Sequence, residues 1–168
     1  IMVGLVYQGR PVLGVVYQPK IDVLYGASKG KGAFVVRDGV QKDIHVSDIS
    51  DLGLARVALS RRAQTIPSFK TLVESLTLSN VTYISSNGIK LCRIAEDVFD
   101  IFFNPSVELG QWDYCAPQCI LEEAGGRVTY FDGSDVIYGR AWDMKKQGII
   151  ASNRNIHDNI RNHIEAVR

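Results

Sequence analysis

Three short segments place small polar residues at points where a helix is expected to begin after a strand or a loop. They are SRR at residues 60–62, SSNG at 85–88 and QWD at 111–113. Helix N-termini present unpaired backbone N–H groups and a partial positive charge, which favour anions such as phosphate. Two such ends that converge would form an anion pocket. The alternative for each segment is an ordinary cap, in which a side chain accepts a hydrogen bond from its own helix.

Asp113 is the acidic residue at the third of these helix starts. It is a favoured N-cap type and suits the positive end of the helix dipole. Its carboxylate is also a ligand type for a hard cation such as Mg²⁺, which usually takes one or two carboxylates from a protein alongside substrate phosphate. Glu108 lies five residues earlier on an expected loop. It could contribute to the surroundings of that metal or hydrogen-bond a hydroxyl of the substrate. The alternative is a solvated acid on a loop.

The cysteines and histidines favour structural roles. Cys115 and Cys119 share one face of an expected helix, and no matching Cys or His pair completes a zinc site, so we expect both to fill the core. The three histidines have no common context that would support a Ser-His-acid triad: His45, His157 and His163.

Two further features are interpreted as structural. The KGKG segment at residues 29–32 has the look of a phosphate loop, but it lacks the P-loop spacing and the following helix, so a hairpin turn explains it. Glu122 and Glu123 lie on a helix body away from its start, and we expect both to face solvent.

The elements that must hold these residues change character near residue 48. Residues 1–46 contain β-branched and aromatic runs between Gly, Pro and Asp breaks, which predict an antiparallel meander of strands. From about residue 49 strand patterns alternate with helix patterns, which predicts a layered α/β unit. The expected strands are 55–60, 81–86, 127–133 and 148–152. The expected helices are 66–79, 87–103 with Asn87 as its start, a helix from the QWD segment to Gly125, and a terminal helix with Ile156, Ile160 and Ile164 in one stripe.

Composition and charge set the broad class. The chain has 168 residues, of which 46% are hydrophobic and 22% charged, enough to bury a core in one domain or in two small layers. A formal net charge of +1 provides no basic field for a nucleic-acid polymer. No apolar stretch approaches the roughly 18 residues that span a bilayer, and the N-terminus lacks a signal-peptide pattern. With an odd number of cysteines in an apolar context, we expect a reduced, soluble, cytoplasmic protein.

The segment WDYCAPQCILEEAGG at residues 112–126 resembles a known family signature. The matching positions are Trp112, Asp113, Ala116, Glu123, Ala124, Gly125 and Gly126. The family is that of the lithium-sensitive, magnesium-dependent phosphomonoesterases, which includes inositol monophosphatases, 3'-phosphoadenosine-5'-phosphate phosphatases and, more distantly, fructose bisphosphatases. Residues 9–34 and 85–103 are similar to the family's strand meander and to the segment whose start contacts substrate phosphate, so the resemblance spans nearly the whole chain.

The resemblance implies an α+β fold, the layered αβαβα sandwich of the sugar phosphatases. Residues 1–48 would be the end of the antiparallel sheet of an N-terminal domain, and residues 49–168 a C-terminal α/β domain. Family members commonly dimerise, so a homodimer is expected.

The resemblance also assigns roles to site residues. It implies that Asp113 ligates a Mg²⁺ that binds the leaving-group side of the substrate. Glu108 is similar to an acid that grips a sugar hydroxyl, although the inositol phosphatases usually place that acid seven residues before the aspartate and here the gap is five. Four residues form the turn that would donate hydrogen bonds to phosphate or ring hydroxyls: Ser85, Ser86, Asn87 and Gly88.

Other features favour a nucleotide as substrate. The segment with Ser60 and Arg61 resembles the S-R segment common in the nucleotide phosphatases, and Lys90 resembles their lysine after the phosphate turn. Two substrates therefore compete, a small phosphorylated polyol such as inositol monophosphate and a 3'(2'),5'-bisphosphate nucleotide.

One departure from the family pattern is an absence. A first signature, D-P-[ILV]-D-G-[ST], and an earlier glutamate precede the strand that corresponds to residues 1–9, and neither occurs here. Those residues hold the other metal ions and activate water for a metal-assisted displacement. We therefore expect the complete protein to be the enzyme and this chain alone to be inactive. Two alternatives stay open: a non-catalytic phosphate-binding or regulatory module, and a structural role in which the exposed first strand pairs with a partner chain.

Overall fold

The first sheet follows the order of the chain. A computed structural model of the chain describes residues 1–61, 67–76, 78, 80–105, 110–139 and 148–166, with the backbone alone at 67–69. Its five N-terminal strands pair antiparallel, each with its neighbour in sequence. They are β1 Met2–Tyr7, β2 Arg10–Gln18, β3 Val23–Ser28, β4 Ala33–Arg37 and β5 Val40–Ile44. The predicted meander is confirmed.

The second sheet has a mixed topology. Its strands are β6 Arg56–Leu59, β7 Asn80–Tyr83, β8 Ile101–Asn104, β9 Arg127–Tyr130 and β10 Ile149–Ser152. They lie in the order β7-β6-β8-β10-β9, so that β8 is separated from both of its neighbours in sequence, β7 and β9. β6 pairs parallel with β7 and β8, whereas β10 is antiparallel to both β8 and β9. The carboxyl ends of β6, β7 and β8 therefore share one edge.

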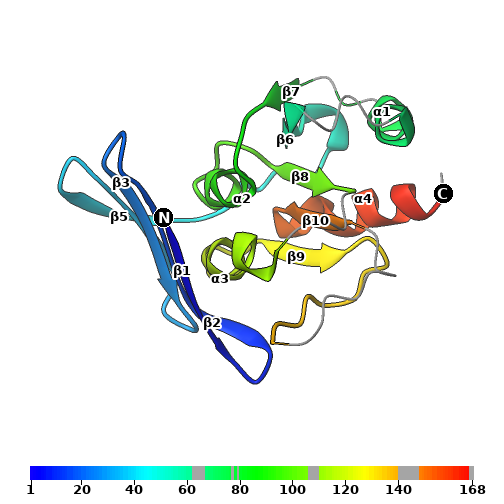
Figure 1. The fold of residues 1–168 in the computed structure, drawn as a ribbon. Coiled ribbons are helices and arrows are strands. Elements are labelled where there is room, and N and C mark those ends of the chain that lie inside the picture. Colours follow the sequence, from blue (N-terminus) through cyan, green and yellow to red (C-terminus); the bar gives the residue numbers. More distant parts are fainter. Residues whose placement is uncertain (62–66, 77, 79, 106–109, 140–147, 167–168) are drawn as a thin grey trace.

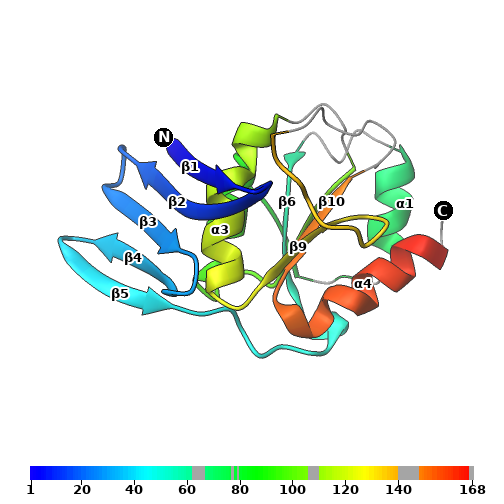
Figure 2. The ribbon, with the colours of Figure 1, turned by 90° about the horizontal axis from the view of Figure 1, so that it is seen from below.

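The helices fill the spaces beside the second sheet. They are α1 Pro67–Ser75, α2 Asn87–Ala95, α3 Cys115–Glu123 and α4 Arg154–Ala166. Figure 1 shows α2 and α3 between the two sheets, and α1 and α4 on the far face of the second sheet. Figure 2 shows the same succession from below, with α3 next to the first sheet. The predicted α+β class and layered arrangement are confirmed; the division into two domains near residue 48 stays a prediction.

Two hydrophobic clusters correspond to these layers. One cluster joins the first sheet to α2 and α3, and the other joins the second sheet to α1 and α4. The predicted stripe on α4 is confirmed, because Ile156, Ile160 and Ile164 are all fully buried. Among the described residues, no helix combines the length and the apolar character needed to cross a membrane.

One predicted helix is wrong in its second half. α2 ends at Ala95 instead of continuing to residue 103, and Asp97 has a positive φ of 58° that breaks the helical path. The apolar run after it forms β8 in the middle of the second sheet, where Ile101 and Phe102 are fully buried. A fully buried strand is a continuous apolar run, and such a run also fits a helical spacing.

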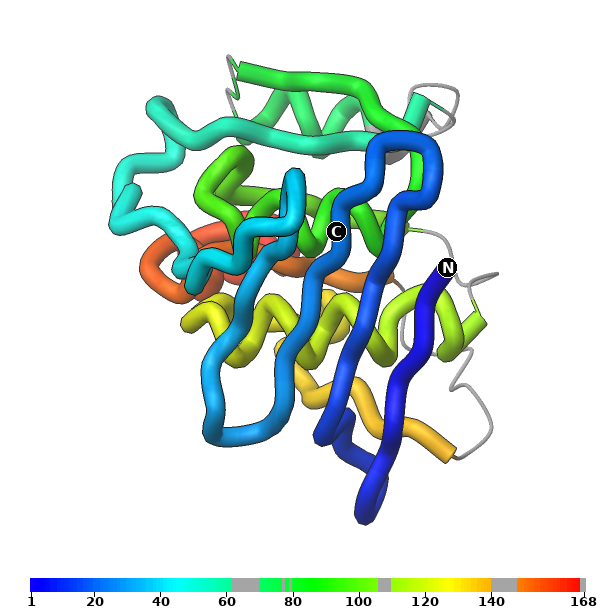
Figure 3. The backbone as a smooth tube through the Cα atoms, turned by 90° about the vertical axis from the view of Figure 1, so that its left-hand side faces the viewer, coloured from blue at the N-terminus to red at the C-terminus, as the bar shows by residue number. Residues whose placement is uncertain are grey.

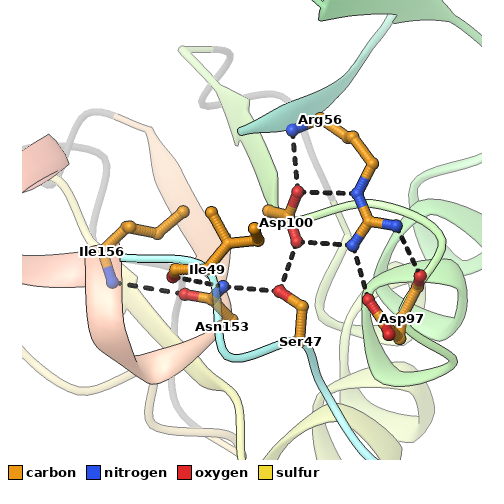
Figure 4. A network of polar contacts seen from close by, with 7 residues as sticks. All are labelled: Ser47, Ile49, Arg56, Asp97, Asp100, Asn153 and Ile156. Carbon is orange, nitrogen blue, oxygen red and sulfur yellow. Dashed lines mark hydrogen bonds and ion pairs between the residues drawn. The ribbon is translucent and has the colours of Figure 1, made fainter. Parts of the chain in front are cut away.

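A buried polar network lies where β6 and β8 begin, at the edge opposite to their carboxyl ends (Figure 4). The fully buried Asp100 accepts hydrogen bonds from the backbone and guanidinium of Arg56 at 2.7–2.8 Å, and from the Ser47 hydroxyl. Asn153 donates to Ser47 at 2.8 Å and so extends the network to the end of β10. The buried carboxylate is fully partnered, which is the arrangement expected of a structural acid.

Candidate active site

The carboxyl ends of three parallel strands gather most of the predicted site residues. β6 leads into Ser60 and Arg61, and β7 leads into Ser85 and Ser86. The backbone N–H of Ile84 donates to the carbonyl of Leu59 at 3.0 Å, which holds the two strand ends together. In open α/β sheets ligands bind at this edge.

The starts of α2 and α3 converge at the same place. A Cβ at Gly88, in the first turn of α2, would lie 3.5 Å from Cγ of Pro117, in the first turn of α3. The same Cβ would lie 2.5 Å from Sδ of Met2 on β1, so a larger residue at position 88 would require the Met2 side chain to move. Figure 3 shows both helices starting near the N-terminal end of the chain and crossing behind the first sheet. The convergence that an anion pocket requires is therefore present.

The start of α2 is strained. Ser86 is its N-cap, with its hydroxyl accepting from the Ile89 N–H at 3.5 Å, and Asn87 is the first residue of the helix, as expected. Ser86 has φ 66° and ψ 115°, a conformation that residues other than glycine rarely adopt. Strained backbone of this kind concentrates at functional sites. Ser85 and Ser86 are exposed at this turn.

Lys90 lies fully buried beneath the turn. Its Nζ donates to Oγ of Ser60 at 2.7 Å and to Oδ1 of Asn87 at 3.3 Å, and it lies 4.9 Å from the ring centroid of Phe102. Burial lowers the pKa of the Lys90 ammonium to about 8. Three residues predicted from two separate segments are thus joined by direct contacts, whereas Arg61 is exposed beside them.

Asp113 ends a short 3-10 helix, Gln111–Asp113, that leads into α3. The N-cap of α3 is Tyr114, which makes no side-chain capping hydrogen bond, so the expectation that Asp113 caps the helix is wrong. Asn104 at the end of β8 donates to the Tyr114 hydroxyl at 3.4 Å, which places the start of α3 beside the carboxyl end of that strand. The Asp113 side chain is partly exposed.

A profile of the inositol monophosphatase family matches residues 1–168. The chain belongs to the inositol monophosphatase family. It is 33% identical over 165 residues to inositol monophosphatase 2 of Solanum lycopersicum, covering 94% of this chain and 58% of that protein. It is 32% identical over 138 residues to the 3'(2'),5'-bisphosphate nucleotidase CysQ of Salmonella typhimurium, covering 81% of this chain and 52% of that protein.

The fold agrees with a solved structure of the same family. The inositol monophosphatase from Anabaena (Nostoc) sp. PCC 7120 matches with a TM-score of 0.80 at 28% identity, covering 99% of this chain and 64% of that one. The chain therefore spans between 52% and 64% of the length of these three relatives. The names of all three are those of phosphatases.

Asp113 fits the role of one metal ligand in this metal-dependent family. Within the described residues its carboxylate makes no hydrogen bond or ion pair, so both oxygens are available to a cation. Among those residues, no group of three or more His, Cys, Asp or Glu side chains is able to hold a metal. Asp113 is thus a single candidate ligand in the part of the inositol monophosphatase fold described here. Glu108 lies outside the described residues.

The other reactive side chains are structural, as expected. Cys115 and Cys119 are buried free thiols. His157 is fully buried between the hydroxyls of Thr129, at 2.9 Å, and Ser152, at 2.8 Å. These contacts join β9, β10 and α4 away from the converging helix starts.

Two acids were misjudged from the sequence. Glu123 accepts hydrogen bonds from three backbone N–H groups in the KGKG segment, and Glu122 accepts from Gln118 at 2.7 Å and pairs with Arg10 at 3.5 Å. The expectation that both face solvent is wrong. The glycine-rich turn and the acidic signature are each recognisable in the sequence. Their contact is not, because 91 to 93 positions separate the residues that form it.

Proposed function

We propose that the complete protein is a Mg²⁺-dependent phosphomonoesterase that acts on a small phosphorylated polyol such as inositol monophosphate. The observation that carries the proposal is the convergence of the α2 and α3 starts with Asp113 between strand β8 and helix α3. Family membership supports phosphatase chemistry, and the named relatives support this substrate class.

The residues of this chain would act mainly by electrostatics. The backbone N–H groups at the start of α2 would donate to phosphate oxygens, and the Ser85 and Ser86 hydroxyls lie exposed at the same turn. Asp113 would hold the metal. A bound Mg²⁺ would supply Lewis-acid stabilisation of negative charge on the phosphate. The buried Lys90 would add positive charge beneath the turn and fix the orientation of Ser60 and Asn87.

The direct test uses protein expressed from the full reading frame that contains this chain. Phosphate release from inositol monophosphate is measured with Mg²⁺, without it, and with EDTA. We expect turnover only with the metal. Turnover that is equal in EDTA would contradict the proposed chemistry, and turnover by the 168-residue chain alone would contradict the expectation that it is inactive by itself.

A bisphosphate nucleotide is the second candidate substrate, and the Lys90 cluster favours it. A buried ammonium held by Ser60 and Asn87 is suited to a second phosphate group, which inositol monophosphate lacks. The ratio of kcat/KM for 3',5'-bisphosphate adenosine to that for inositol monophosphate decides between them. We expect Lys90→Met to lower this ratio if the nucleotide is the substrate, and to leave it unchanged if the polyol is.

A further inference from the structure

Both helices that start at the candidate site end in a glutamate. Glu96 is the C-cap of α2, and Glu123 is the last residue of α3. The C-terminal end of a helix carries partial negative charge, so an acidic side chain is unfavourable there and a basic one is usual. Two such acids on two neighbouring helices therefore need specific partners.

Glu96 finds its partners on the first sheet. It accepts from the Tyr25 hydroxyl on β3 at 2.7 Å and from the Arg37 guanidinium on β4 at 2.6 Å. Arg93 on α2 itself adds a contact at 3.0 Å. Burial raises the pKa of the Glu96 carboxyl, but the hydrogen bonds from Tyr25 and Arg37 outweigh burial, so the pKa lies below its ordinary value.

Glu123 finds its partners on the turn between the same two strands. The backbone N–H groups of Gly30, Lys31 and Gly32 donate to its two carboxylate oxygens at 2.9, 3.1 and 3.0 Å. Gly30 and Gly32 have φ of 74° and 76°, which lets successive N–H groups point toward one anion. The segment that resembled a phosphate loop is therefore an anion nest, and a side chain of the protein occupies it.

All of the first-sheet donors come from β3, its turn and β4, and they hold the ends of α2 and α3 opposite to the site. A helix of nine residues is about 13 Å long and behaves as a stiff rod, so fixing one end constrains the other. We propose that Glu96 and Glu123 are positioning residues, through which the β3–β4 hairpin contributes to the mutual placement of the two helix starts, in addition to the direct packing of β1 and β2 on those starts. This inference rests on the proposed function of the site at those starts.

The test compares Glu123→Gln and Glu96→Gln with a matched control in the protein from the full reading frame. Glutamine keeps the size of Glu123 but places an NH₂ group against backbone N–H donors, so the nest opens. The control is Lys31→Ala, because Lys31 contributes only its backbone N–H to the nest. At a temperature well below unfolding, we expect each Gln variant to show about tenfold lower kcat and weaker Mg²⁺ half-saturation, since small misplacements of reacting groups are expensive. The control keeps the parent values.

A role confined to stability gives a different result. Both Gln variants would then melt at lower temperature while kcat and the Mg²⁺ half-saturation stay at parent values, and this outcome overturns the proposal. Amide hydrogen exchange separates the proposal from the function it rests on, because it needs no activity. We expect faster exchange at the amides of residues 115, 116, 118 and 119 in Glu123→Gln and of residues 87–91 in Glu96→Gln, with Lys31→Ala unchanged. Faster amide exchange that is confined to the C-terminal ends of α2 and α3, where the substitutions lie, overturns the proposal even if the phosphatase assay succeeds.

Discussion

The two sheets differ in how their strands are connected and in what they contribute to the site. In the first sheet every strand pairs with its neighbour in sequence, and in the second the order β7-β6-β8-β10-β9 separates β8 from both β7 and β9. The second sheet delivers the candidate site residues from the ends of its parallel strands. The first sheet packs β1 and β2 against the starts of the same two helices and contacts their far ends through Glu96 and Glu123. The candidate chemistry and the support of the helix pair therefore come from different sheets.

Asp113→Asn is the sharpest test of the second-sheet side. In the complete protein we expect kcat/KM to fall by at least about 100-fold, because the amide is a poor ligand for Mg²⁺. The melting temperature stays close to that of the parent, because Tyr114 and not Asp113 is the N-cap of α3. Phosphate release measures kcat/KM, and thermal unfolding measures the melting temperature. Glu74→Gln, an exposed change on α1, serves as the control. Activity near the parent level would contradict the assignment of Asp113 as a metal ligand.

Gly14→Ala tests the first-sheet side, where the expected loss is in stability. A Cβ at Gly14 on β2 would overlap the backbone carbonyl of Ala116 on α3, and neither strand nor helix can yield without a shift. Overpacking of this kind destabilises by about 3 kcal/mol, or roughly 6–12 °C in melting temperature for a chain of this size. Gly53→Ala, which meets only an Asp51 oxygen at 3.3 Å, is the matched control. Equal melting temperatures for the two variants would contradict the close packing of sheet and helix.

His157 makes the second sheet sensitive to acid. Burial is the main cause that lowers the pKa of His157 to about 4, whereas a histidine in the unfolded chain titrates near about 6.5. The unfolded state therefore binds more protons between these values, and stability is retained above pH 6.5 and lost as the pH falls toward 4. Between these pH values the free energy of unfolding falls by at most about 1.4 kcal/mol per pH unit.

Urea unfolding at several pH values between 4 and 7.5 measures this dependence. We expect His157→Gln to flatten the curve in that window, and His45→Gln, an exposed change, to leave it as in the parent. If the free energy of unfolding of His157→Gln depends on pH as in the parent, the acid sensitivity belongs to carboxylates such as Asp100. Burial raises the pKa of Asp100, but its hydrogen bonds with Arg56 and Ser47 outweigh burial and lower that pKa.

Lys90 gives the smallest expected effect, and it concerns binding at the edge of the second sheet. Since the pKa of Lys90 is lowered to about 8, its positive charge is lost as the pH rises through that value. We expect inhibition by inorganic phosphate to weaken above pH 8 by about tenfold, because the positive charge beneath the turn is lost and the hydrogen bonds that hold Ser60 and Asn87 are no longer charge-assisted. Lys90→Met would show weak inhibition at every pH, whereas Lys70→Met on exposed α1 would follow the parent. A pH profile shared by Lys90→Met and the parent would contradict this role.

The sequence predicts features that depend on neighbours along the chain. The meander was readable because its turns carry their own signals, such as the Asp38-Gly39 pair with φ of 52° and 73°. The end of α3 was readable for the same reason. Gly125 has a φ of 95°, and the N–H groups of Gly125 and Gly126 donate to Glu122 and Leu121 in a Schellman motif.

Features that depend on distant partners were not readable. The strand β8 was taken as a continuation of α2 because nothing local distinguishes a central strand from a buried helix. The role of Glu123 required its contact with a turn more than 90 residues away. For the site, the residue types at the helix starts were recognisable, but the contact of Lys90 with Ser60 appears only when the end of β6 and the start of α2 are brought together.

The position of β10 has a consequence for synthesis of the protein. The strands β1 to β5 have all left the ribosome once residue 44 has, whereas β10 ends at residue 152 and lies between β8 and β9. Until it arrives, β8 and β9 each lack the partner that covers one edge, and exposed apolar edges are where nascent chains associate wrongly. The sheet that carries the candidate site residues is therefore completed after the strands β1 to β5, and its inner edges stay unpaired until residue 152 has been synthesised.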